Sequence, residues 1–128
     1  MRNLDTLAAQ TAQQIVADTQ NSAAASEVDS LATKALGVLQ ENGVYACALF
    51  LYSRTGKEKD KIAPLMRRQL LALAAQEVLN QQSPPDQAEK ALRFVSDDIA
   101  SDLDTLLLVK QVWEQTLIYV RYGAKAGG

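Results

Sequence analysis

Side chains suited to catalysis are few in this chain, and the most common of them is absent. The 128 residues include no histidine, which removes the usual general base and the usual metal ligand. Cys47 is the only cysteine. It lies in an apolar segment, where a thiol is ordinarily a small core residue. This composition predicts a non-catalytic protein of a reducing, cytoplasmic compartment.

Acidic residues are concentrated in the segment SDDIASDLD (96–104). Asp97 and Asp98 form one pair, and Asp102 and Asp104 form a second. Such carboxylates can hold a cation or act as acid and base, so a small enzyme with a carboxylate site here is one alternative. They also stand at an expected helix start, where acidic side chains stabilise the positive end of the helix dipole. We favour this capping interpretation and predict neither a metal nor a cofactor.

Positive charge is concentrated in residues 54–68. This segment has a local net charge of +4 in a chain whose net charge is −2. Lys and Arg on a loop and the following helix can neutralise phosphates of a nucleic acid without reading its bases. Ordinary solvated surface charge is the alternative interpretation. The predicted nucleic-acid-binding residues are Arg54, Lys57, Lys59, Lys61, Arg67 and Arg68, extended on the last helix by Arg121 and Lys125.

The elements that position these residues are expected to be helices. Ala and Leu, the strongest helix formers, supply much of the 48% apolar fraction, and aromatic residues are only 5%. Helical patterning or helix-start signals define six segments: 3–20, 27–41, 44–53, 64–80, one beginning at 83, and 102–122. We therefore expect a single all-α domain over residues 1–128, a compact bundle of about six helices.

Several of these helices have recognisable boundaries. Asn42-Gly43 predicts a helix stop, because glycine adopts a left-handed conformation without a Cβ clash. The next segment, 44–53, is apolar nearly all round, so we expect a fully buried central helix, although a buried strand has the same pattern. In the segment SPPD, Ser83 is expected to cap the fifth helix, with Pro84 at its first position.

The last helix is expected to be long. Ser101 or Asp102 is predicted to cap it, Gly123 to end it, and residues 122–128 to form a frayed tail. One apolar stripe is expected to face the core: Leu103, Leu106, Leu107, Lys110, Trp113, Leu117 and Val120. Trp113 and the tyrosines could stack on nucleic-acid bases, but their place on helix stripes favours the core.

No segment predicts export or membrane insertion. Residues 1–20 carry Asp5 and Asp18 and lack a continuous apolar stretch. The longest apolar runs, such as 46–52, are far shorter than the roughly 18 residues of a membrane span.

The segment LATKALGVLQENGVYACALFLYSRTGKEKDK (31–61) has three consecutive features: a helix ending in a glycine–hydrophobic step, an apolar helix with an Ala-Leu-Phe core, and a Ser-Arg-Thr-Gly-Lys sequence. In this it resembles the small-subunit family of the type III-B CRISPR effector, the Cmr complex. The corresponding residues are Gly43-Val44, Ala48-Leu49-Phe50 and Ser53-Arg54-Thr55-Gly56-Lys57.

A second similarity to this family lies near the C-terminus. Its members have a long helix with an aromatic residue, basic residues and then alanines spaced by two. Here that pattern is Tyr119-Val-Arg121-Tyr122-Gly-Ala124-Lys-Ala126. The chain departs from the family at Tyr119, where Trp is frequent, and at Gly123, where a second aromatic is usual. It is also acidic, whereas many members are basic.

The resemblance implies a non-catalytic, all-helical subunit of a ribonucleoprotein that serves antiviral defence. Several copies would stack head to tail beside the backbone subunits, which hold the guide RNA and cleave the target. The implied partners are guide RNA and target RNA, other Cmr subunits and further copies of this chain, with no membrane. The basic residues of 54–68 would face nucleic acid or an acidic neighbouring subunit.

Two other functions stay open. The chain could be the small subunit of another type III complex, which shares the helical bundle. It could instead be a helical adaptor or dimer with no nucleic-acid role, whose basic segment pairs with an acidic partner. The adaptor predicts no salt-dependent affinity for RNA, and the enzyme alternative predicts that Asp97 and Asp98 bind a metal.

Overall fold

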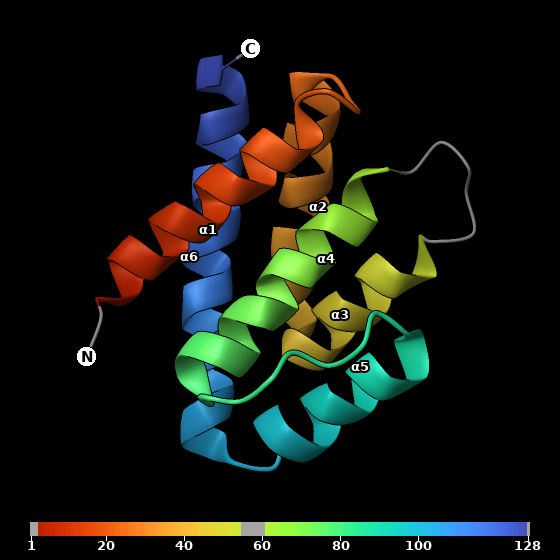
Figure 1. The fold of residues 1–128 in the computed structure, drawn as a ribbon, viewed down its shortest axis with the longest axis vertical. Helices are drawn as coiled ribbons and strands as arrows, with labels where there is room; N and C mark the ends of the chain where they lie inside the picture. The colour runs from red at the N-terminus through yellow and green to blue at the C-terminus, as the bar shows by residue number, and fades with distance from the viewer. Residues whose placement is uncertain (1–2, 55–60, 128) are drawn as a thin grey trace.

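The computed structural model describes residues 3–54 and 61–127 (Figure 1). Every regular element in these ranges is helical, which confirms the predicted all-α bundle of about six helices. None of these helices has the length and apolar character that a membrane span requires. The element order is α1 (Leu4–Thr19), α2 (Ala25–Asn42), α3 (Val44–Ser53), α4 (Ile62–Ala72), η1 (Leu73–Val78), α5 (Ala88–Phe94), η2 (Val95–Ile99) and α6 (Leu103–Gly127). The segments η1 and η2 are π-helical turns that directly continue α4 and α5.

Helix α6 is the axis of the bundle. It makes its most extensive contacts with α2 and α1, and Figure 1 shows α1 and the lower end of the continuous α4–η1 helix crossing in front of it, with α5 and η2 beside its lower end. Trp113 lies at its centre with 1% of its surface exposed. The Trp113 indole Nε1 donates a 2.8 Å hydrogen bond to the carbonyl of Leu70, which joins α6 to α4. The prediction that Trp113 is a core residue is confirmed.

Helix α3 follows α2 after a single residue. Gly43 has φ +96°, and α2 ends at Asn42 and α3 begins at Val44, so the predicted helix stop and the helical form of 44–53 are both confirmed. The predicted burial on all sides is wrong. Tyr45 and Leu49 are 43% and 48% exposed, because they lie one turn apart on a face that no described element covers.

The backbone at Gly43 yields a testable prediction. At φ +96° and ψ −174° a Cβ meets no neighbouring atom, so Gly43→Ala introduces backbone strain alone and is expected to cost about 1–3 kcal/mol of stability. Gly37→Ala is the matched control, because its Cβ also meets nothing and it lies inside α2, where alanine should stabilise by up to about 1 kcal/mol. Urea unfolding of both variants measures the difference. Equal effects would contradict this account.

The two ends of α6 differ in how well the sequence predicted them. The Asp102 carboxylate accepts a 3.0 Å hydrogen bond from the Thr105 amide, which confirms the N-cap. The prediction that Gly123 ends the helix is wrong, because α6 continues to Gly127. A Cβ on residue 123 would lie 3.3 Å from Val16 Cγ2, so the glycine instead permits close approach of α1.

The predicted apolar stripe of α6 is wrong in its first two turns. Leu103 and Leu107 are 66% and 53% exposed, and the buried stripe begins at Val109. The reason is length. The 25 residues of α6 span about 37 Å at 1.5 Å per residue, whereas α1 and α2 span only about 24 and 27 Å and cannot cover all of it.

The predicted start of the fifth helix is also wrong. Helix α5 begins at Ala88 rather than near Ser83. Ser83 and Pro84 each precede a proline, and a residue before proline is disfavoured in the helical region. The segment between η1 and α5 therefore has no regular structure, and this leaves Asp86 available for contacts with α4.

Candidate nucleic-acid interface

The structure describes six of the eight predicted nucleic-acid-binding residues, and Lys57 and Lys59 lie outside the described part of the chain. Four of the six are grouped around two carboxylates. Asp86 is the partner of Arg67 and Arg68, and Asp29 is the partner of Arg121 and Lys125. The predicted residues are therefore divided between separate clusters, each with an acidic residue of its own.

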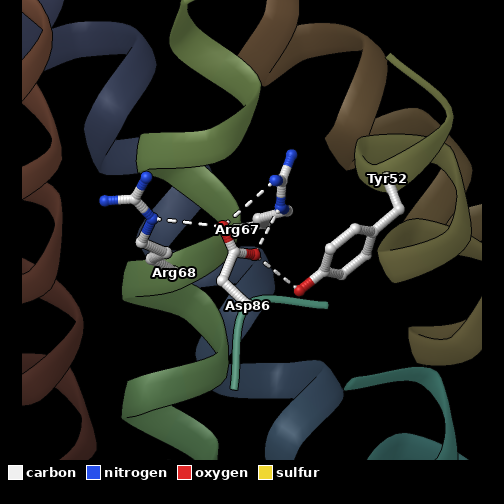
Figure 2. Close-up of polar contacts among 4 residues, drawn as sticks. All are labelled: Tyr52, Arg67, Arg68 and Asp86. Atoms are coloured by element: carbon white, nitrogen blue, oxygen red, sulfur yellow. Dashed lines mark hydrogen bonds and ion pairs between the residues drawn. The ribbon is translucent and has the colours of Figure 1, made fainter. Parts of the chain in front are cut away.

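Asp86 is the centre of a cluster drawn from three elements, which we call the Asp86 cluster: Tyr52 of α3, Arg67 and Arg68 of α4, and Asp86 (Figure 2). Arg67 binds the carboxylate in a bidentate manner, with Nε 2.9 Å from Oδ1 and Nη2 3.2 Å from Oδ2. The Tyr52 hydroxyl donates to Oδ1 at 2.8 Å, and Arg68 Nε donates to Oδ2 at 3.3 Å. The guanidinium carbon of Arg67 also lies 4.3 Å from the centroid of the Tyr52 ring, a cation–π contact.

Arg67 does not face outward, which counts against its predicted contact with a nucleic acid. Its side chain is 7% exposed, against 58% for Arg68, and a phosphate cannot reach it in this structure. The spacing of apolar residues in the sequence already indicated that Arg67 is buried. Ala63 lies four residues before Arg67 and Leu70 three residues after it, on the buried stripe of α4, and the adjacent Met66 is buried as well.

The ionisation states in the Asp86 cluster are well separated. Burial alone raises the pKa of Asp86, but hydrogen bonds from Arg67 and Tyr52 and the charge of Arg67 outweigh it, so the pKa lies below its usual value. Burial, followed by the hydrogen bond to Asp86, raises the pKa of Tyr52 to about 12. At neutral pH the carboxylate is therefore charged and the phenol is a neutral donor.

The second cluster joins the end of α6 to α2. Arg121 Nε donates to Asp29 Oδ1 at 3.1 Å, and Lys125 Nζ lies 3.6 Å from Asp29 Oδ2. The hydrogen bond from Arg121, aided by the charge of Lys125, holds the pKa of Asp29 below its usual value against the opposing effect of burial. The side chains of Arg121 and Lys125 are 32% and 56% exposed. Both cations therefore have an internal partner, and their contacts with Asp29 join α6 to α2.

Three cations lie near the end of α3 and along α4: Lys61 and Arg68 are exposed, and Arg54 is half-buried. The Arg54 guanidinium lies 5.8 Å from the centroid of the Phe50 ring, and Lys61 is exposed directly before α4. Lys61, the N-cap residue of α4, precedes Arg68 by seven residues, or about two helical turns, so the two lie on the same side of α4, roughly 10 Å apart along its axis. We call Arg54, Lys61 and Arg68 the outer basic group.

No protein-family model matches this chain, and a search of curated proteins finds no significant match. The assignment of function therefore depends on the residues themselves.

The carboxylates of 96–104 have ordinary local partners. Ser96 Oγ donates to Asp97 at 3.1 Å, and the Gln81 amide approaches Asp98 at 3.4 Å. Hydrogen bonds from the hydroxyl and then the amide of Thr105 hold the pKa of Asp102 below its usual value, as a capping residue requires. Among the residues that the structure describes, no group of three or more acidic or cysteine side chains could hold a metal ion.

The lone thiol is part of the core. Cys47 is fully buried, and its Sγ lies 3.7 Å from the carbonyl oxygen of Ala35. Burial raises the pKa of Cys47 to about 12, so the thiol stays protonated and unreactive at neutral pH. The prediction of a small core residue is confirmed. Of the four tyrosines, Tyr52 is buried and Tyr119 is partly buried, whereas Tyr45 and Tyr122 are exposed, so their predicted place in the core is confirmed only in part.

Two residues of the Asp86 cluster were missed by sequence reasoning. Tyr52 reads as one more apolar position of α3, and Asp86 reads as an acidic residue at a helix start. Asp86 lies 34 residues from Tyr52 and 19 from Arg67. The burial of Arg67 was the one clue to Asp86, because a buried arginine needs a carboxylate partner.

Proposed function

We propose that this protein is a non-catalytic small structural subunit of the type III-B CRISPR effector, the Cmr complex. Several copies are arranged along the complex and line the channel in which guide RNA pairs with target RNA. The observation that carries the proposal is the step from α2 to α3. The residues that resemble the family there, Gly43-Val44 and Ala48-Leu49-Phe50, form a left-handed glycine followed by an apolar helix.

The nucleic-acid surface of this proposal is smaller than the charge pattern alone suggests. Arg67 is buried, Arg121 is only 32% exposed, and Arg121 and Lys125 belong to a separate cluster around Asp29 of α2. The outer basic group supplies the contact instead, together with Lys57 and Lys59 of the same segment. Contacts of this kind neutralise phosphates, so binding is independent of RNA sequence and weakens as salt increases.

The test is recovery of tagged protein from its native host, with sequencing of bound RNA and identification of bound proteins. Wild-type protein is expected to recover CRISPR guide RNA and effector subunits. For the purified protein–RNA complex, Arg54→Glu with Lys61→Glu should weaken RNA binding roughly tenfold or more at low salt.

The control for this charge reversal is Lys34→Glu with Lys90→Glu, which makes the same change in net charge at exposed positions of α2 and α5. It should leave RNA binding close to that of the wild type. Recovery of neither guide RNA nor effector subunits, from a host that expresses the complex, would refute the proposal.

Exposed apolar residues favour a second candidate, a helical adaptor or dimer with no role in nucleic-acid binding. Tyr45 and Leu49 on α3, and Leu103 and Leu107 on α6, are each about half exposed or more, as side chains at a protein interface would be before assembly. This candidate predicts recovery of protein partners without RNA at any salt concentration. Recovery of guide RNA with subunits of a different type III complex would instead identify the other small subunit.

A further inference from the structure

A hollow opens beside the Asp86 cluster, between α4 and the segment that leads to α5. Its volume is about 330 Å³, and it is lined by Tyr52, Arg68, Gln69, Leu71, Ala72, Ser83, Pro84 and Asp86. Since one water occupies about 30 Å³, the hollow has room for a phosphate group with several waters. It is distinct from the carboxylate segment at 96–104 and from the second cluster, in which Arg121 and Lys125 contact Asp29.

The charge around this hollow is unbalanced. Two guanidinium groups, Arg67 and Arg68, share the single carboxylate of Asp86, which leaves one positive charge over. A further anion in the hollow would reduce this excess of positive charge.

Arg68 is the residue placed to bind that anion. It contacts Asp86 only through Nε, at 3.3 Å, and its side chain is 58% exposed. Figure 2 shows both terminal nitrogens of Arg68 directed away from the carboxylate. That end of a guanidinium group presents two parallel N–H donors, the geometry that matches two oxygens of a phosphate.

Two neutral side chains of the hollow can add donors. Ser83 Oγ accepts a 3.0 Å hydrogen bond from Gln76, so its own hydroxyl proton is available to a ligand. The Gln69 amide has a single long contact, 3.4 Å, with Asp18. An amide nitrogen carries two donors, so the second remains for an oxygen in the hollow.

We propose that this hollow binds one phosphate group, held at two oxygens by Arg68 and supported by Ser83 and Gln69. Asp86 is the internal anion that holds the arginines in place when the hollow is empty and limits the affinity when it is filled. If the phosphate belongs to an RNA strand, this inference rests on the proposed function, because RNA binding would bring the phosphate to the hollow. Free inorganic phosphate has the same chemistry, and the test below separates the two sources.

The test follows backbone amide signals by NMR as inorganic phosphate, or a single-stranded oligouridine, is added to the full-length protein. Phosphate is expected to shift the amide signals of Gln69 and Ser83 in a saturable manner. Arg68→Gln should abolish these shifts and weaken oligouridine binding roughly tenfold, the effect of losing one charged bidentate contact. The control is Arg93→Gln, which also removes an exposed arginine near a carboxylate, with 74% of its side chain exposed.

Each outcome separates this inference from the proposed function. If phosphate moves these signals but neither the protein nor its complex binds RNA, the site stands with free phosphate as its ligand and the RNA role fails. If RNA binding depends on Arg54 and Lys61 but not on Arg68, and phosphate leaves Gln69 and Ser83 unmoved, the phosphate site is overturned and the RNA role stands. Equal losses in the Arg68 and Arg93 variants would also overturn it.

Discussion

Asp86→Ala is expected to lower the free energy of unfolding by about 3 kcal/mol, one of the two largest effects we predict for a single substitution in this chain. Arg67 is 7% exposed and takes both of its ionic contacts from Asp86. Removal of the carboxylate leaves a buried guanidinium without a counter-charge, and such unpaired charges cost about 3–5 kcal/mol. The lower end applies here, because Asp86 itself is 29% exposed. Urea unfolding followed by circular dichroism measures the loss.

Two controls separate the buried pair from ordinary surface charge. Glu89→Ala removes the partner of Arg93 in an exposed pair within α5 and should change stability by less than about 0.5 kcal/mol. Arg67→Met combined with Asp86→Ala removes both buried charges and should recover most of the loss, because a well-packed apolar pair replaces a buried ion pair at little cost. A double variant as unstable as Asp86→Ala alone would contradict the ionic explanation.

Acid provides a third measure of the same contact. The pKa of Asp86 in the folded protein lies below its usual value, so its stabilising effect is complete above the ordinary carboxyl pKa. It is lost as the pH falls through the folded-state pKa. Wild-type protein should therefore lose more stability below about pH 4 than Asp86→Ala does. Asp29 and Asp102 also have lowered pKa values, but they are present in both proteins and cancel in the comparison.

Trp113→Ala is expected to lower the free energy of unfolding by about 4 kcal/mol, the other of the two largest effects. Trp113 is among the largest fully buried side chains, and its removal opens a cavity where α6 meets α4 and breaks the hydrogen bond to Leu70. Tryptophan-to-alanine changes in cores cost about 3–5 kcal/mol. Circular dichroism measures this loss, because the variant lacks the only tryptophan.

Comparison with two milder variants shows which property of Trp113 matters. Trp113→Phe keeps an aromatic ring but loses volume and the indole donor, and should cost about 1–2 kcal/mol. Tyr122→Ala removes an aromatic of the same helix that is 62% exposed, and should change stability by less than about 0.5 kcal/mol. If the Trp113 and Tyr122 alanine variants were equally stable, the core position of Trp113 would be contradicted.

The helices could be predicted because their causes are local. Gly43 stops α2 through its own backbone freedom, and Asp102 caps α6 through an amide three residues away. The stripe that contains Trp113 repeats within a single helix. Each of these signals acts within one or two turns, so the sequence alone was sufficient to predict six helices.

The candidate site could be predicted only in part. The concentration of positive charge at 54–68 is a property of the sequence, but its exposure is not. Lys61 and Arg68 face outward, whereas Arg67, adjacent to Arg68, is buried. The side chains of neighbouring helical residues differ in direction by about 100°, so Arg67 points into the core while Arg68 points to the surface.

The sequence by itself determined the helical class, the helix stop at Gly43, an N-cap at Ser101 or Asp102 and the excess of positive charge. Tertiary structure alone decided that Asp86 pairs with Arg67 across 19 residues. It also decided that Gly123 lies inside α6, where it lets Val16 of α1 pack closely, rather than ending the helix. It also decided that Leu103 is exposed. The physical reason is range. Propensity, capping and periodicity act between residues close in the chain, whereas the partner of a buried charge and the covering of a helix end depend on which distant segments pack together.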